Sequence, residues 1–174
     1  MTRLTLTDYI RPIADFPKPG ILFRDITPLL AHAEAFRQTV KRLAELVSGR
    51  PIDLVAAAEA RGFLFAAPLA LELGKGLVLI RKKGKLPSKC ISHEYQLEYG
   101  TDTLEIHADC IFPGAHVLVV DDVLATGGTI DACCRLVEKA GGTVAACAFI
   151  LELVPLAGRG RIARYETLSL IRYD

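Results

Sequence analysis

One short run, VLVVDDVLATGGT at residues 117–129, constrains the fold more than any other part of the chain. Its first four residues are all apolar, which is typical of a β-strand buried on both faces. Asp121 and Asp122 follow at the carboxyl end, where open α/β sheets bind their ligands. Small and hydroxyl residues come next and lead into an amphipathic helix. The run therefore predicts a strand, a turn and a helix within a parallel sheet.

The residue types in this turn suit a phosphorylated sugar. The turn consists of Ala125, Thr126, Gly127, Gly128 and Thr129. Its backbone N–H groups, together with the helix N-terminus, can hold a phosphate dianion. The two aspartates would repel a phosphate but accept hydrogen bonds from a vicinal diol, and ribose 5-phosphate carries both groups. The alternative is a buried strand that ends in a solvated Asp pair and a Gly-rich turn, which explains the strand but not the order of the residues after it.

Strands and helices alternate along the rest of the chain. Hydrophobic periodicity and glycine stops predict strands over 53–58, 77–80, 144–151 and 167–171, and helices over 4–10, 33–48, 62–73 and 129–140. Such alternation predicts an α/β fold with a central, mostly parallel twisted sheet and helices on both faces. The length of 174 residues predicts a single domain over 1–174.

Two segments depart from this regular pattern. Residues 83–102 are polar, are punctuated by Gly84, Pro87 and Gly100, and are too long for an ordinary connection, so we expect a flexible lid loop. A disordered hairpin without a catalytic part is the alternative. FPKPGILFRDITPLL at 16–30 mixes prolines and apolar residues without a clear period. It does not fit easily into the sheet, and we expect residues 1–30 to form an N-terminal hood over one edge of the site.

Composition excludes several classes of protein. The net charge is only +1, which gives no support to a broad surface for nucleic acid or anionic membranes. The five cysteines are odd in number and form no C-x-x-C pair, which favours reduced thiols in a cytosol over disulfides or zinc. The start resembles no signal peptide, and no apolar run is long enough to cross a membrane. These features predict a soluble, cytoplasmic protein.

Four blocks resemble the adenine phosphoribosyltransferases over nearly the whole chain. They are residues 16–30, EARGFLF at 59–65, LIRKKGKLP at 79–87 with YQLEYG at 95–100, and residues 117–129. The last block resembles the signature for 5-phosphoribosyl 1-diphosphate (PRPP) that phosphoribosyltransferases for several bases share, whereas the first block and YQLEYG point to adenine. The resemblance implies a purine-salvage glycosyltransferase, usually a homodimer. It would transfer 5-phosphoribosyl from PRPP to N9 of adenine with Mg²⁺, giving AMP and pyrophosphate.

The resemblance also implies how adenine is recognised. Adenine offers an amino donor at C6 and an acceptor at N1, which a backbone C=O and N–H can satisfy. Leu22 and Arg24 would supply these main-chain contacts, Phe23 would stack on the purine, and Leu153 would close the other face. Packing in a hydrophobic core is the alternative for Phe23 and Leu153.

Cations are expected around the diphosphate of PRPP. The resemblance implies that Arg61 binds it and that Gly62 permits a close backbone approach. A basic cluster directly before the lid is assigned to PRPP as well, and it consists of Arg81, Lys82 and Lys85. A solvated basic face is the ordinary alternative for such a cluster.

Displacement at the anomeric carbon, with oxocarbenium character, requires little covalent catalysis. We expect Asp121 and Asp122 to grip the ribose hydroxyls or waters on Mg²⁺, with the metal held mainly by PRPP and by no direct protein ligand. Glu98 on the lid matches the family's general acid/base for the N9 proton, and Tyr99 would orient substrate or close the site. The alternative is that Glu98 only stabilises the closed lid.

Two alternative functions, a PRPP sensor and a transferase for another base, remain open. One apparent dinucleotide-binding motif does not indicate such a site. A PRPP sensor that regulates transcription or binds RNA would lack the catalytic lid or carry a further domain, and a transferase for an oxo-purine would read another base. GRGRIA at 158–163 fits the loose dinucleotide pattern G-x-G-x-x-A. Too few residues follow it for the helix, strand and acidic residue which that pattern requires, so it is interpreted as a turn.

Overall fold

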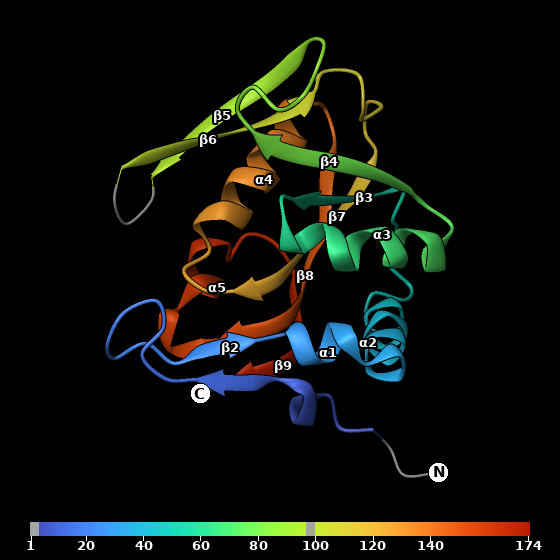
Figure 1. Ribbon diagram of the computed structural model, residues 1–174. Coiled ribbons are helices and arrows are strands. Elements are labelled where there is room, and N and C mark those ends of the chain that lie inside the picture. Colours follow the sequence, from blue (N-terminus) through green and yellow to red (C-terminus); the bar gives the residue numbers. More distant parts are fainter. Residues whose placement is uncertain (1–3, 97–99) are drawn as a thin grey trace. The chain divides into compact units, whose positions relative to one another are not determined.

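The computed structural model describes residues 4–96 and 100–174 (Figure 1). It divides into two compact units, residues 1–42 and 43–174. No helix in the described part of the chain is long and apolar enough to cross a membrane. All five cysteines are free thiols.

The first unit contains a small antiparallel sheet and short helices. The 3₁₀ turn η1 (Leu6–Tyr9) precedes strand β1 (Arg11–Ile13), which pairs with β2 (Phe23–Asp25). The helices α1 (Thr27–Ala31) and α2 (Ala33–Leu46) follow, and α2 continues into the second unit. Segment 16–30 stays out of the large sheet, as predicted, because its strand pairs only with β1.

A charged cluster ties β1 to the start of α1. The guanidinium of Arg11 donates to Oδ2 of Asp25 at 2.7 and 3.0 Å, and Oδ1 of Asp25 accepts the Thr27 N–H at 2.9 Å. The pKa of Asp25 is lowered, chiefly by the hydrogen bond from the Thr27 amide. The carboxylate thereby satisfies a backbone donor that the first turn of α1 leaves without an intrahelical partner.

The second unit is built on a seven-stranded sheet with the order β5-β6-β4-β3-β7-β8-β9. Its strands are β3 (Leu54–Ala58), β4 (Gly76–Lys82), β5 (Cys90–Gln96), β6 (Thr101–His107), β7 (His116–Leu124), β8 (Thr143–Leu153) and β9 (Thr167–Tyr173). The five strands from β4 to β9 in this order are parallel, whereas β5 and β6 are antiparallel. The predicted α/β class with a mostly parallel sheet is confirmed.

Helices cover both faces of this sheet. Successive side chains of a strand point to opposite faces, so Ala57 faces away from Ala56 and Ala58. A β-carbon placed on Gly62 of α3 (Arg61–Leu73) would lie 3.3 Å from that of Ala57. Ala56 and Ala58 instead belong to the hydrophobic cluster beneath α4 (Gly128–Lys139). The remaining helical pieces are η2 (Val154–Leu156) and α5 (Gly158–Arg161).

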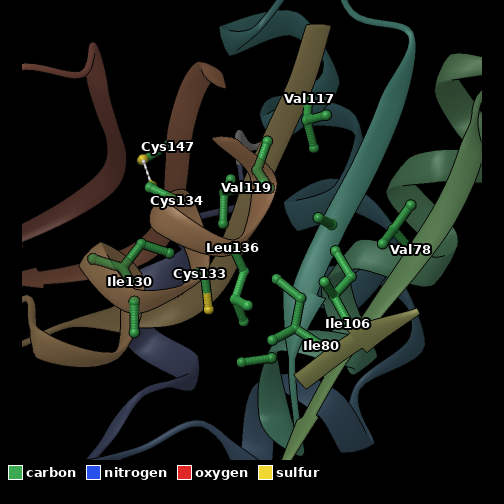
Figure 2. Packing of buried hydrophobic residues seen from close by; sticks show 14 of the residues in the cluster. Val78, Ile80, Ile106, Val117, Val119, Ile130, Cys133, Cys134, Leu136 and Cys147 are labelled. Carbon is green, nitrogen blue, oxygen red and sulfur yellow. Dashed lines mark hydrogen bonds between the residues drawn. The ribbon is translucent and has the colours of Figure 1, made fainter. Parts of the chain in front are cut away.

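The hydrophobic cluster fixes α4 against the strands that carry the site (Figure 2). Val117 and Val119 of β7 pack with Ile130, Cys133 and Leu136 of α4, and none of the five is more than 3% exposed. Both ends of the turn at 125–127 are therefore held by buried elements. Burial of this kind stabilises by roughly 25 cal/mol for each Å² of apolar surface removed from water.

Two elements differ from the sequence-based expectation. Strand β7 continues to Leu124, so both aspartates lie within the strand, and Asp121 pairs with Phe149 of β8. Much of segment 83–102 forms the hairpin β5–β6 at the edge of the sheet and is not an irregular loop (Figure 1). The reason is an alternating pattern in β5, in which Ile91 and Tyr95 pack on the cluster while Ser92, Glu94 and Gln96 are exposed.

Candidate active site

The end of β7 brings two adjacent carboxyl groups to the N-terminus of α3. Oδ1 of Asp121 accepts the N–H of Asp122 at 2.9 Å. A β-carbon on Gly62 would lie 3.1 Å from this same oxygen and 3.2 Å from the carbonyl oxygen of Val120. Glycine at this position thus allows the helix to approach the strand closely.

Arg61 balances the negative charge of Asp122, the more deeply buried of the two carboxylates. Its Nε lies 2.8 Å from Oδ2 of Asp122, whose side chain is 4% exposed. Burial raises the pKa of Asp122, and the charge of Arg61 opposes that rise. Burial also raises the pKa of Asp121, and the neighbouring Asp122 charge adds to the rise. Carboxyl groups with raised pKa values at the end of a parallel strand are characteristic of functional sites.

The turn after β7 presents free backbone donors. Gly127 has φ 81°, a left-handed conformation that glycine adopts readily, and α4 begins at the next residue. The N–H of Asp131 donates to the carbonyl of Gly127 at 3.0 Å. Within residues 4–96 and 100–174, the N–H groups from Thr126 to Ile130 donate to no acceptor. This group of donors at a helix N-terminus is suited to an anion.

A second charged cluster lies at the carboxyl ends of β3 and β4. Oε1 of Glu59 accepts the N–H of Lys82 at 2.6 Å, and Oε2 lies 2.9 Å from Nζ of Lys85 and 3.4 Å from Nη2 of Arg81. Burial alone would raise the pKa of Glu59, but these three donors lower it to about 2. Glu59 is therefore ionised at neutral pH. The peptide bond between Glu59 and Ala60 is cis.

The structure brings the three residues of the predicted basic cluster together and gives each a carboxylate partner. Arg81 and Lys85 contact Glu59, and Nζ of Lys82 lies 3.2 Å from Oδ2 of Asp102. The cluster is thus a mixed network of charges. A diphosphate would have to compete with Glu59 and Asp102 for these cations, and their assignment to PRPP stays a prediction.

The residues predicted to bind adenine belong to different units. Leu22 is half exposed, and Phe23 packs edge-on against Phe16 with ring centroids 5.1 Å apart, both within the first unit. Arg24 lies beside Phe23 in β2, whereas Leu153 ends β8 in the second unit. Glu98 and Tyr99 lie outside the described residues. These assignments therefore also remain predictions.

Tyr95 is a neighbour of the site that the sequence reasoning did not single out. Burial raises the pKa of its hydroxyl, and a hydrogen bond with the Thr129 side chain opposes that rise. Tyr95 thus connects β5 with the start of α4. It opens the YQLEYG block, but only the pairing of β5 alongside α4 reveals the contact with Thr129.

The chain is similar to known proteins over most of its length. The model of the phosphoribosyl transferase domain matches residues 29–166. The chain belongs to the phosphoribosyltransferase family. An adenine phosphoribosyltransferase of Thermotoga maritima is 55% identical over 173 residues, which cover 99% of this chain and 100% of that protein.

Solved structures agree with this assignment. The adenine phosphoribosyltransferase of Thermoanaerobacter pseudethanolicus has a TM-score of 0.94 at 53% identity, covering 97% of this chain and 100% of that one. The enzyme of Trypanosoma brucei, in complex with AMP, pyrophosphate and ribose-5-phosphate, has a TM-score of 0.85 at 26% identity and covers 96% and 78%. The resemblance to adenine phosphoribosyltransferases and the enzyme class, a pentosyltransferase, are confirmed.

Proposed function

We propose that this chain transfers the 5-phosphoribosyl group of PRPP to N9 of adenine, giving AMP and pyrophosphate. The observation that carries the proposal is the row of unused N–H donors from Thr126 to Ile130 beside the paired Asp121 and Asp122. A phosphate and a vicinal diol on one ribose ring match these two groups. The Trypanosoma brucei relative, in complex with AMP, pyrophosphate and ribose-5-phosphate, supports the same ligand class.

In the reaction the bond from C1 of ribose to the pyrophosphate oxygen breaks and the bond from C1 to N9 forms. The leaving pyrophosphate takes the electron pair of the broken bond, and N9 loses its proton. The turn holds the 5-phosphate, and the aspartates hold the ribose hydroxyls, so that C1 is aligned with N9. Arg61 and the cluster around Glu59 supply positive charge for the diphosphate.

Magnesium fits the chemistry of this donor set. The carboxylate oxygens of Asp121 and Asp122 would accept hydrogen bonds from the waters that Mg²⁺ retains, while PRPP would hold the metal itself. A bound Mg²⁺ would neutralise charge on the leaving pyrophosphate. The carboxyl pair would then be held ionised in spite of the pKa rise that burial causes.

Base recognition and proton transfer are assigned to residues matched by the family resemblance. Main-chain groups of Leu22 and Arg24 would bind the adenine edge, while Phe23 and Leu153 would cover its faces. Glu98 would accept the N9 proton, and Tyr99 would close the site. A pocket built for an amino donor and a ring acceptor would reject oxo-purines, because they leave buried groups mismatched.

We further propose a cytoplasmic homodimer. Leu64 and Leu71 of α3 are 44% and 83% exposed, and Leu79 of the neighbouring β4 is 41% exposed. Phe65 and Leu69 of the same helix are fully buried. Helix α3 therefore carries apolar side chains on its outer face as well as its inner one, which is typical of a helix at a subunit interface.

The deciding experiment measures pyrophosphate release from Mg-PRPP with adenine, hypoxanthine, guanine and xanthine in separate reactions. Release with adenine alone, with AMP as the co-product, is the expected result. Release with an oxo-purine would keep the PRPP assignment and overturn the base-reading role of residues 22–24. Binding of PRPP without release for any base would instead favour a PRPP sensor.

A further inference from the structure

The short helix α5 packs directly on the turn at residues 125–129, called the phosphate-binding turn below because of its proposed role. A β-carbon on Gly158 would lie 2.1 Å from the carbonyl oxygen of Ala125 and 2.9 Å from the amide nitrogen of Gly127. In the other direction, a β-carbon on Gly127 would lie 2.6 Å from the carbonyl oxygen of Gly158. These distances leave no room for a side chain at either glycine. Backbone therefore meets backbone, and the position of α5 fixes that of the turn.

Helix α5 is in turn anchored to the sheet. Nε and Nη2 of Arg159 donate to the two carboxylate oxygens of Glu152 at 2.9 and 2.5 Å, and Nη1 donates to the carbonyl of Thr167 at 2.7 Å. Glu152 is only 3% exposed and also accepts the hydroxyl of Ser169 at 2.8 Å. Bidentate arginine–carboxylate pairs fix geometry as well as adding energy. The segment behind the turn is thus a rigid support.

Arg161, at the end of α5, extends toward the start of α4. A β-carbon on Gly128, the first residue of α4, would lie 3.3 Å from Nη1 of Arg161. A β-carbon on Gly127 would lie 3.2 Å from the β-carbon of Arg161. The guanidinium is therefore beside the same helix N-terminus that carries the unused N–H donors.

The surroundings of Arg161 differ from those of the arginines near it in sequence. Arg159 and Arg172 contact Glu152, and Arg164 contacts Glu138. Across the described ranges, no carboxylate pairs with Arg161. A cation at a helix N-terminus is opposed by the helix dipole and by the aligned N–H groups. This arrangement becomes favourable when an anion sits between the guanidinium and those groups.

We propose that Arg161 contacts the 5-phosphate of the ribosyl substrate, and that α5, through Gly158 and Arg159, positions the turn that binds it. The proposal rests on the proposed function and deepens it, because it names a side-chain cation for a phosphomonoester that is otherwise bound by backbone. The diphosphate cations lie on other elements, at the ends of β3 and β4 and the start of α3. Arg161 therefore serves the phosphate that stays on the product.

The test uses ribose 5-phosphate, which carries the phosphate without base or pyrophosphate. Arg161→Gln is expected to weaken its binding, measured by titration calorimetry, by about 10- to 100-fold, because a charge-assisted hydrogen bond contributes roughly 1.5–3 kcal/mol. Arg161→Lys should recover part of the loss, since it keeps the charge but not the planar fork. Arg164→Gln is the matched control, and its affinity should equal that of the wild type.

Kinetics supply a second readout. Arg161→Gln should raise KM for PRPP more than it lowers kcat, and should leave KM for adenine unchanged. Equal affinity of Arg161→Gln and the wild type for ribose 5-phosphate would overturn the role of Arg161. If the wild type itself fails to bind ribose 5-phosphate, the proposed function fails, so the two failures are distinguishable.

The support by α5 is tested with two glycine variants. Gly158→Ala should displace the turn and weaken ribose 5-phosphate binding at least 10-fold, whereas Gly160→Ala should not, because a β-carbon there meets nothing within 4 Å. Thermal unfolding of both variants shows whether either has lost its fold. A folded Gly158→Ala protein with wild-type affinity would contradict the positioning role.

Discussion

At the scale of single residues, Asp121 illustrates a conflict between stability and function. Burial raises its pKa, and the charge of Asp122 raises it further, so ionisation costs folding free energy. This cost is absent below the unfolded pKa near 3.8 and grows as pH rises through the folded value. The apo protein therefore disfavours the ionised form of this carboxyl group, which a ligand's hydroxyls or a cation would stabilise.

We predict that Asp121→Asn stabilises the apo protein and impairs catalysis. At pH 7 the melting temperature should rise by roughly 2–4 °C for each kcal/mol recovered, while kcat/KM for PRPP falls at least 10-fold. The gain should shrink toward pH 4, where the carboxyl group of the unfolded wild type becomes protonated as well. Asp109→Asn, at an exposed position, is the control for calorimetric scans across pH. A variant less stable than the wild type at pH 7 would contradict this account of the site.

The pKa of Glu59 is shifted in the opposite direction to that of Asp121, so its ionisation stabilises the fold. Its pKa is held at about 2, below its usual value of 4.5, so its stabilising contribution is present above pH 4.5 and is lost as pH falls toward 2. Glu59→Gln should therefore flatten the decline of the urea midpoint with falling pH in this window. It should also lower that midpoint at pH 7, because Lys85 and Arg81 lose their partner. Glu94→Gln, at an exposed position on β5, should retain the wild-type profile.

At the scale of elements, the hairpin β5–β6 is joined through Tyr95 to Thr129, in the turn that we propose to bind phosphate. We predict that Tyr95→Phe raises KM for PRPP about 2- to 10-fold, since a net hydrogen bond contributes roughly 0.5–1.5 kcal/mol. The ring would still pack on the hydrophobic cluster, so the melting temperature should stay within about 2 °C of the wild type. Steady-state kinetics with PRPP varied at saturating adenine measure the effect. An unchanged KM would show that the hydroxyl does not position Thr129.

Helices and strands could be predicted from the sequence where a single hydrophobic periodicity extended over the whole segment. The apolar runs at 54–58 and 117–120 and the helix after Gly128 follow directly from pattern. Strand β5 was missed because its outward residues are polar and its inward ones include His93, so the alternation is weak in the sequence. The contact of α5 with the turn was missed for another reason. Its contact with Ala125 and Gly127 joins segments far apart in the chain, and no local pattern records such a contact.

At the scale of the whole molecule, the predicted site contains residues that are close in sequence and residues that only folding brings together. Asp121, Asp122 and the turn after them lie within a few residues of one another, so the sequence already placed them together. Glu59 contacts both Arg81 and Lys85. These contacts could not be predicted from the sequence, because they depend on the parallel pairing of β3 with β4 in the folded sheet. The sequence pattern thus identifies the turn that we propose to bind phosphate, whereas the ion pairs around it depend on tertiary pairing.

The last prediction concerns the proposed homodimer and its interface on α3. Helix α3 exposes 83% of Leu71 and 44% of Leu64 although its other face is buried, and Leu79 of β4 adds a third apolar side chain. If these residues form the dimer interface, Leu71→Glu combined with Leu64→Glu should convert the dimer to a monomer, because two buried charges without partners cost several kcal/mol. Sedimentation velocity measures the change. Leu156→Glu, which alters a 47% exposed leucine on η2, is the matched control and should remain dimeric. A dimer that survives the double change on α3 must use another surface, whereas a wild type that sediments as a monomer would refute the dimer itself.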